Sequence, residues 1–283
     1  MDFWPAYSKC LIVCHNVMDS HMNPILEVNN LTMQFGGLKA LENIRIRVEP
    51  QQTVALIGPN GAGKTTFFNC ITGIYTPTQG DIHLYSETNR KYRINGKKPN
   101  TITELGMART FQNIRLFNNM TVLENLMVGQ HCRTQTGVLG AVLKNQRALE
   151  EEKKVIQTGS QLLEDFNLSH RANTLAKNLP YGEQRRLEIA RALATQPRLL
   201  LLDEPAAGMN PKETLELVSL IQKIKHTYQI SILIIEHDMK MIMTISNLIY
   251  VLDYGKLIAR GSPENIKDDP KVIQAYLGED YDA

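Results

Sequence analysis

One short stretch constrains this chain more than any other, the run Gly58-Pro59-Asn60-Gly61-Ala62-Gly63-Lys64-Thr65. It matches the phosphate-binding loop pattern, in which a glycine-rich turn is followed by Lys and a hydroxyl residue. An apolar, β-branched run at 53–57 precedes it, and residues 66–72 can continue as a helix. A strand, a glycine loop and a helix are the context this pattern requires, because loop amides and a helix N-terminus then surround an anion. The alternative is an ordinary glycine-rich turn, and the flanking strand and helix count against it.

Lys64 and Thr65 give the loop its chemistry. Lys64 can reach the β- and γ-phosphates of a nucleoside triphosphate as a point charge, and the Thr65 hydroxyl can ligate Mg²⁺. Asp203 and Glu204 follow the apolar run 199–202, where a carboxylate can hold Mg²⁺ opposite Thr65. Glu204 is also placed to accept a proton from an attacking water. The alternative is two exposed acids at a strand end, but the phosphate loop needs such a partner and this pair is the best candidate.

A histidine and a glycine mark two further positions. His237 follows the apolar run 230–235. At the carboxyl end of a strand it can donate a hydrogen bond to a γ-phosphate, although a structural histidine is the alternative. Gly182, within Leu179-Pro180-Tyr181-Gly182-Glu183-Gln184, opens a predicted helix whose free amides can bind an anion. One nucleotide cannot easily use both anion-binding ends of a single chain, so we predict a head-to-tail dimer in which each end serves the other subunit.

An aromatic residue lies upstream of the phosphate loop. Phe35 is predicted to sit in the turn Gln34-Phe35-Gly36-Gly37. There it can stack on a purine base or act as a hydrophobic plug, and the residues alone leave both readings open.

Composition sets the broad class. The 283 residues are 43% hydrophobic and 21% charged, which is a globular composition with length for a large domain or a core plus a subdomain. The net charge of +2 does not call for a nucleic-acid partner. The four scattered cysteines suit a reducing cytosol, and Cys10 with Cys14 lacks the second pair that a metal site needs. No run approaches the ~18 apolar residues of a membrane helix, so any membrane role requires another chain to span.

The pattern along the chain predicts an α/β fold. Three strands are expected in 25–57 and one at 81–84, followed by a basic, solvated loop containing Lys91, Arg93, Lys97 and Lys98. Strand-like runs disappear over 121–176, where helical spacing takes over. The apolar runs 199–203 and 230–235 predict strands covered on both faces, as in a parallel sheet, and a hairpin is expected around 253–255. Residues 1–22 differ from the rest, so we expect a non-native or flexible extension before a domain at 23–283.

Together these segments resemble the nucleotide-binding subunits of ATP-binding cassette (ABC) transporters, over roughly residues 25–280. The motifs occur in the family's order: a Walker A loop at 58–65, a Q-loop glutamine at Gln112, a signature segment at 179–184, a Walker B strand at 199–204, a D-loop at 207–210 and a switch histidine at His237. Within the family the sequence is most similar to LivG-type subunits of bacterial branched-chain amino acid uptake systems. That similarity lies in 109–117, 181–191, 203–214 and 275–279, and in an insert around 137–143.

The resemblance implies an ATPase with a P-loop NTPase (RecA-like) core, an antiparallel β subdomain and an α-helical subdomain inserted at about 113–178. Its cofactors would be ATP and Mg²⁺, with Glu204 as catalytic base, His237 at the γ-phosphate and Gln112 reaching the metal and the attacking water. The implied metal ligands are Thr65, Gln112 and Asp203. The implied nucleotide-binding residues are Phe35, Gly58, Pro59, Asn60, Gly61, Ala62, Gly63, Lys64, Thr65 and Thr66, completed by Tyr181, Gly182 and Asn210 of the opposite subunit.

The resemblance also implies partners and a location. These are a second ATP-binding subunit, identical or paralogous, integral membrane permease subunits and, indirectly, a periplasmic substrate-binding protein. The chain would lie peripherally at the cytoplasmic face of the inner membrane. Related subunits serve urea uptake and lipopolysaccharide export. A soluble cassette ATPase acting on DNA or ribosomes is disfavoured by the single cassette, missing coiled-coil arms and near-neutral charge. A regulatory module without turnover is disfavoured by the presence of Glu204 and His237.

Two departures from the family pattern concern the opposite-subunit half of the site. Pro180 stands where the signature usually has Ser, and Tyr181 where it has its first Gly. Pro180 offers neither a hydroxyl nor an N–H, so Gly182 and the helix N-terminus are expected to carry more of the phosphate contact. Asn210 replaces the common D-loop Asp, which keeps a hydrogen-bonding side chain and removes its charge.

Overall fold

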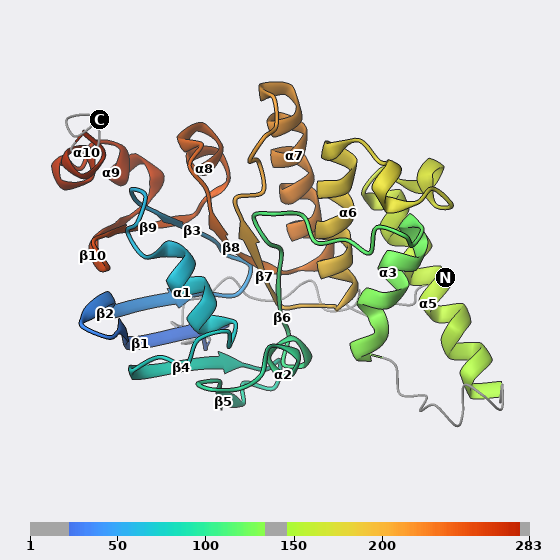
Figure 1. The fold of residues 1–283 in the computed structure, drawn as a ribbon, viewed down its shortest axis with the longest axis horizontal. Coiled ribbons are helices and arrows are strands. Elements are labelled where there is room, and N and C mark those ends of the chain that lie inside the picture. The colour runs from blue at the N-terminus through green and yellow to red at the C-terminus, as the bar shows by residue number, and fades with distance from the viewer. Residues whose placement is uncertain (1–22, 134–145, 278–283) are drawn as a thin grey trace, which may run out of the picture.

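The computed structural model of the chain describes residues 23–133 and 146–277 (Figure 1). The extension expected at 1–22 and the insert around 137–143 lie outside the described residues. Two sheets and a set of helices make up the part that is described. The larger sheet carries the phosphate loop and the acidic strand end, so it is the element that positions the candidate site.

The larger sheet has six strands in the order β10-β9-β3-β8-β7-β6. Their bounds are β3 (Thr53–Ile57), β6 (Met107–Arg109), β7 (Leu199–Asp203), β8 (Ser231–Ile235), β9 (Leu248–Asp253) and β10 (Lys256–Gly261). Neighbouring strands run parallel except for β10, which forms the predicted hairpin with β9. Every residue of β3, β7 and β8 is buried. The prediction of a parallel sheet covered on both faces is confirmed.

Alternate residues of these strands feed two hydrophobic cores. In β3, Ala55 and Ile57 belong to one core, whereas Val54 and Leu56 belong to the other. The first core is closed by α6 (Tyr181–Ala194), α7 (Pro211–Tyr228) and α8 (Met239–Ile245), which lie together over one face in Figure 1. The second is closed by α1 (Lys64–Ile71) and by the smaller sheet. Because both faces are covered, only the strand ends remain available for polar chemistry.

The smaller sheet is antiparallel, in the order β2-β1-β4-β5. Its strands are β1 (Leu26–Phe35), β2 (Leu38–Val48), β4 (Gln79–Tyr85) and β5 (Lys91–Arg93). In β2, Ile44, Ile46 and Val48 are buried and alternate with more exposed residues, as predicted. One face of this sheet therefore packs on the second core while the other faces solvent.

The basic stretch that was predicted to be a solvated loop is partly regular structure. Lys91 and Arg93 lie on β5, where the Nζ of Lys91 is 2.9 Å from Oε2 of Glu27 and the Nε of Arg93 is 2.6 Å from Oδ1 of Asp81. Residues beyond Lys98 form α2 (Pro99–Glu104). The strand lies at a sheet edge, where its two outer residues form cross-strand ion pairs and Tyr92 between them packs against the second core.

Helices dominate the segment in which strand-like runs disappear. Among its described residues the regular elements are α3 (Val122–Gln130), α5 (Gln146–Asp165) and the short 3-10 helices η1 (His131–Arg133), η2 (Ser169–Arg171) and η3 (Ala176–Asn178). Thr121 and Glu124 form a capping box at the start of α3. α3 packs against both α5 and α6. The subdomain boundary at about 113–178 stays a prediction.

The C-terminal part of the described chain ends in α9 (Pro263–Lys267) and α10 (Pro270–Leu277), which lie beside β10 in Figure 1. No helix within residues 23–133 and 146–277 has the length and apolarity needed to cross a membrane.

Candidate functional site

The phosphate loop joins the end of β3 to the start of α1, as the sequence predicts. Gly58 has φ 149° and Gly63, the N-cap of α1, has φ 104°. A Cβ at Gly58 would lie 2.0 Å from the Leu252 carbonyl oxygen, and one at Gly63 would lie 2.7 Å from that of Ala40. At Gly61, also at positive φ, a Cβ would meet nothing within 4 Å. The outer glycines are therefore required by close packing, while the middle of the loop faces open space.

Lys64 is nearly buried, at 6% exposure, and its side chain folds back over this loop. Its Nζ donates hydrogen bonds to the carbonyl oxygens of Gly58 and Pro59, at 2.6 and 2.7 Å. Thr65 next to it is exposed. A buried ammonium, an open glycine turn and the first amides of α1 form a cradle whose charge and shape fit a phosphate group.

Asp203 ends β7 as predicted, and the structure pairs it with an arginine. Its Oδ2 lies 2.7 Å from Nη2 of Arg109, and both side chains are 6% exposed. Arg109 ends β6 and also donates to the side chains of Asn69 and Thr72 on α1 and its C-terminal cap. The Asp203 carboxylate thus has a counter-ion built into the fold.

Arg109 had no assigned role in the sequence analysis beyond its place in a run typical of LivG-type subunits. Its guanidinium lies between the rings of Phe68 and Phe111, with its carbon 5.3 and 5.0 Å from their centroids. A charge inside the otherwise uncharged run Met107-Ala108-Arg109-Thr110-Phe111 was the available signal, because a buried charge requires a partner.

The side chains of Gln112 and His237 meet at Glu204, and each of these three residues follows the end of a different strand. Nε2 of Gln112 donates to its Oε2 at 2.6 Å, and Nε2 of His237 lies 2.9 Å from its Oε1. Glu204 itself has φ 46°, in the left-handed region, which is unusual for a residue with a side chain. The structure therefore brings together the three residues that the resemblance implies are catalytic.

Glu236 holds two of the backbone segments next to this group, and the sequence analysis assigned it no role. The carboxylate is 4% exposed. Its Oε1 accepts a hydrogen bond from the Ala206 amide at 2.7 Å, and its Oε2 accepts from the His237 amide at 2.8 Å. One buried acid thus ties the segment after Glu204 to the segment that carries His237.

Phe35 is the last residue of β1, and the tight turn that follows is Gly36-Gly37. The expectation that Phe35 lies in the turn is therefore off by one position. The side chain is 43% exposed and makes an edge contact with Tyr75, at a centroid distance of 5.3 Å. An exposed ring favours a stacking surface over a buried plug.

Comparisons with known proteins agree with this geometry. A family profile described as ABC transporter matches residues 41–207, which is more than half of the chain. The chain belongs to the ABC transporter family. A second profile, described as branched-chain amino acid ATP-binding cassette transporter, matches residues 256–282.

Individual relatives cover nearly the whole chain. A high-affinity branched-chain amino acid transport ATP-binding protein of Pseudomonas aeruginosa, BraF, is 50% identical over 256 residues, which is 90% of this chain and 98% of the relative. LivG of Escherichia coli K12, named in the same way, has the same identity and coverage. Two solved structures, a nucleotide-free cassette of an ABC transporter and the ADP conformation of such a cassette, have TM-scores of 0.75 and 0.77. Their identities are 32% and 33%, covering 89% and 91% of this chain and 98% and 100% of those chains. The predicted ABC-type fold is confirmed.

The residues that the ABC resemblance assigns to the opposite subunit have contacts of their own. The Tyr181 hydroxyl donates to the Ala207 carbonyl oxygen at 2.8 Å. Oδ1 of Asn210, the N-cap of α7, accepts from the Lys212 and Glu213 amides. Pro180 is the N-cap of α6 and gives no side-chain cap. The side-chain oxygen of Asn210 is therefore occupied by the start of α7, and its side-chain nitrogen is the atom that can bond another partner.

The donor set also fits Mg²⁺. Among the described residues no group of three or more His, Cys, Asp or Glu side chains could hold a metal ion alone. Mg²⁺ usually takes one or two protein oxygens and shares the rest of its shell with phosphates and water. The ligands that the resemblance implies, Thr65, Gln112 and Asp203, each have a side-chain oxygen that could serve in this way.

Proposed function

We propose that this chain is the ATP-hydrolysing subunit of an ABC transporter for the uptake of branched-chain amino acids. The observation that carries the ATPase assignment is the meeting of Gln112 and His237 on Glu204, at 2.6 and 2.9 Å. β3 and β8 are parallel neighbours, so the phosphate loop and His237 follow strand ends on the same edge of the sheet. ABC-type ATPase activity is the chemistry that such a site performs.

In this mechanism Lys64 and the loop 58–66, in which every residue except Pro59 has a backbone N–H, hold the triphosphate, and Phe35 stacks on the adenine. Mg²⁺ held by Thr65 and Asp203 would offset the charge of the phosphates. Glu204 accepts a proton from the attacking water while the water oxygen bonds to the γ-phosphorus. The bond from that phosphorus to the bridging oxygen breaks, which leaves ADP and phosphate. Gln112 orients the water, and His237 stabilises the γ-phosphate.

A second ATP-binding subunit, the same chain or a paralogue, completes the site with its Tyr181, Gly182 and Asn210. The exposed ring of Tyr181, at 45%, and the amides at the start of α6 support this placement. ATP binding closes the pair and hydrolysis reopens it, which moves membrane permease subunits that receive substrate from a periplasmic binding protein. The chain lies peripherally at the cytoplasmic face of the inner membrane.

The substrate class is supported by the relatives. BraF and LivG carry branched-chain amino acid transport in their names, and the match at 256–282 is described for the same class. Urea uptake and lipopolysaccharide export are the alternatives. Deleting the gene in its own host and measuring uptake of labelled leucine, isoleucine and valine against labelled urea separates them. Loss of urea uptake alone would overturn the assignment.

Glu204→Gln tests the hydrolytic role. We expect hydrolysis to fall by about a hundredfold or more, because general-base catalysis contributes about 10²–10⁴, while a fluorescent ATP analogue still binds. Glu216→Gln, at an exposed acid on α7, is the matched control and should leave hydrolysis unchanged. Undiminished hydrolysis in Glu204→Gln contradicts the assignment of the base. Size-exclusion chromatography of Glu204→Gln with MgATP should show a dimer, and a strictly monomeric ATP complex counts against the shared site.

A further inference from the structure

The first turns of α6 carry a charged pair that is buried more deeply than the site itself. The side chains of Arg185 and Glu188 are 0% and 2% exposed, and Nη1 of Arg185 lies 2.8 Å from Oε2 of Glu188. They lie on the same helix as the buried Leu187 and Ile189. A buried ion pair contributes little net stability compared with apolar residues of similar volume. The pair of Arg185 and Glu188 therefore needs an explanation other than its contribution to stability.

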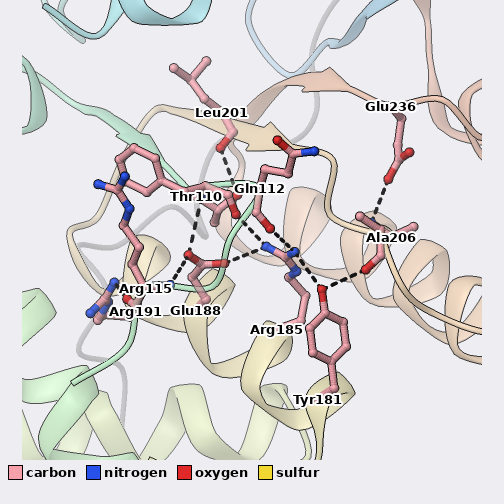
Figure 2. A network of polar contacts seen from close by, with 12 residues as sticks. Thr110, Gln112, Arg115, Tyr181, Arg185, Glu188, Arg191, Leu201, Ala206 and Glu236 are labelled. Carbon is pink, nitrogen blue, oxygen red and sulfur yellow. Dashed lines mark hydrogen bonds and ion pairs between the residues drawn. The ribbon is translucent and has the colours of Figure 1, made fainter. Parts of the chain in front are cut away.

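The partners of this pair are main-chain atoms of the Q-loop segment 111–115 (Figure 2). Arg185 donates from Nη1 to the Phe111 carbonyl oxygen and from Nη2 to the Gln112 carbonyl oxygen, both at 2.7 Å. Oε1 of Glu188 accepts from the Arg115 amide at 3.1 Å and, more weakly, from the Phe111 amide at 3.5 Å. Both ends of the segment are thus held by one helix. The planar guanidinium bonds the two carbonyls from two nitrogens in a fixed fork, whereas a lysine ammonium would have to bond both from one nitrogen.

Tyr181 extends the network to the D-loop. Its hydroxyl accepts from Nη2 of Arg185 at 3.3 Å and donates to the Ala207 carbonyl oxygen at 2.8 Å. A Cβ at Gly208 would lie 3.6 Å from the Tyr181 ring. Figure 2 shows the chain of contacts continuing from Ala206 to Glu236, so it runs from the Q-loop to the segment that carries His237.

We propose that Tyr181, Arg185 and Glu188 are positioning residues for hydrolysis. They hold the Gln112 backbone in a fixed position relative to the segment after Glu204. The proposal rests on the proposed ATPase function. Its consequence is the 2.6 Å contact between Nε2 of Gln112 and Oε2 of Glu204, which joins two loops that no shared element connects. An aromatic hydroxyl at position 181 has a role here that glycine, the usual residue, cannot perform.

Two conservative variants of the full chain test this. Tyr181→Phe removes only the hydroxyl, and we expect kcat for ATP hydrolysis to fall about fivefold to tenfold, as the loss of a net hydrogen bond predicts. Arg185→Lys keeps the charge but loses the fork, and we expect a fall of about a hundredfold, the usual effect of a small misplacement. KM for ATP and the affinity for a fluorescent ATP analogue should stay within about threefold, because the phosphate loop is untouched and Tyr181→Phe keeps the exposed ring that we place at the partner's nucleotide. Arg186→Lys, on the same helix but paired with Glu216 at the surface, is the matched control.

Amide hydrogen exchange without nucleotide gives a readout that does not depend on hydrolysis. The hydrogen-exchange rate at the Arg115 amide and its neighbours should rise at least about tenfold in Arg185→Lys, because segment 111–115 then opens more often. In Arg186→Lys the rate should stay unchanged. The double variant Tyr181→Phe/Arg185→Lys should lose less kcat than the product of the single effects, because the two residues share one hydrogen-bonded path.

The outcomes separate this proposal from the proposed function. If the wild-type chain does not hydrolyse ATP, the proposed function fails and the positioning role for hydrolysis fails with it, while hydrogen exchange still decides whether Arg185 holds the backbone of segment 111–115. If the wild type hydrolyses and Glu204→Gln does not, but both variants keep kcat within twofold of wild type, the pair is only structural and the proposal is overturned. If Arg185→Lys does not fold, Tyr181→Phe decides alone. A parallel rise in KM and fall in kcat/KM with kcat unchanged also overturns it.

Discussion

Two buried arginines flank the Q-loop, and they differ in what they bind. Arg109 ends β6, three positions before Gln112, and its partners are the side chains of Asp203, Asn69 and Thr72. Arg185 lies in the second turn of α6, and apart from Glu188 and the Tyr181 hydroxyl its partners are main-chain carbonyls. In each guanidinium the Nε has no hydrogen-bond partner in the described structure, so all of the binding is done by the two terminal nitrogens.

The difference indicates two kinds of control over one site. Arg109 fixes the orientation of a carboxylate that we assign to Mg²⁺, and it leaves Oδ1 of Asp203 outside the ion pair. Arg185 fixes the path of a backbone segment, whatever side chains that segment carries. Side-chain partners can be neutralised by substitution, whereas backbone carbonyls cannot. The two regions should therefore respond differently when each arginine is removed.

Removing either arginine should produce the largest effects. Arg109→Met and Arg185→Met each leave a buried carboxylate without its counter-ion, so we expect losses of about 3–5 kcal/mol in the free energy of unfolding. Arg185→Met should lie at the upper end, because the carbonyls of Phe111 and Gln112 also lose their donors. Urea unfolding of the full chain followed by circular dichroism measures both. A loss in Arg109→Met that exceeds the loss in Arg185→Met would break the comparison.

Neutralising the partner should rescue one region and not the other. In Arg109→Met/Asp203→Asn the buried charge is gone, and we expect about 2 kcal/mol of the lost stability to return. In Arg185→Met/Glu188→Gln we expect about 1 kcal/mol or less, because each buried carbonyl without a donor still costs about 1–3 kcal/mol. Double-mutant cycles from the same urea curves give both values, and equal rescue would mean that the backbone contacts carry no weight.

Most of the fold could be predicted because its signals are local. The phosphate loop follows from one run of residues, and the buried strands follow from apolar runs such as 199–202. β5 was missed because it has only three residues, two of them charged, and it pairs only with β4 at the edge of the sheet. Such a strand has no periodicity of its own to read.

The residues of the candidate catalytic group could be named in advance, but the residues that position them could not. Gln112, Glu204 and His237 occupy motif positions, so the resemblance identifies them. Glu236 and Arg185 act through backbone atoms far away in sequence, which no motif records. The spacing of Arg185 and Glu188, three apart on the helix that carries Leu187, gave a partial signal. Charges among core positions of a helix must be paired, although their partners cannot be deduced from spacing.

Glu188 should also give its region a pH dependence. Burial raises the pKa of the Glu188 carboxyl, while hydrogen bonds from the Arg115 amide and the charge of Arg185 oppose this rise. With a raised folded pKa, the folded chain retains a proton above pH 4.5 that the unfolded chain has lost. The associated stability is fully present below that pH and is lost as pH rises through the folded pKa. The difference in unfolding free energy between wild type and Glu188→Gln should therefore fall with rising pH across this window, and a difference that grows with pH would reverse the sign we assign.

The smallest effect should come from the surface ion pair of Arg186, which follows Arg185 on α6. Arg186 pairs with Glu216 of α7 at 2.5 Å, and these side chains are 24% and 47% exposed. Solvent screens such a pair, so Glu216→Gln should change the free energy of unfolding by about 0–1 kcal/mol. Raising the salt concentration should reduce even this difference, whereas the buried pair of Arg185 should respond little. Urea unfolding of wild type, Glu216→Gln and Glu188→Gln at low and high salt makes the comparison within one helix. If Glu216→Gln lowers the free energy of unfolding as much as Glu188→Gln does, then burial does not explain the difference between Arg185 and Arg186.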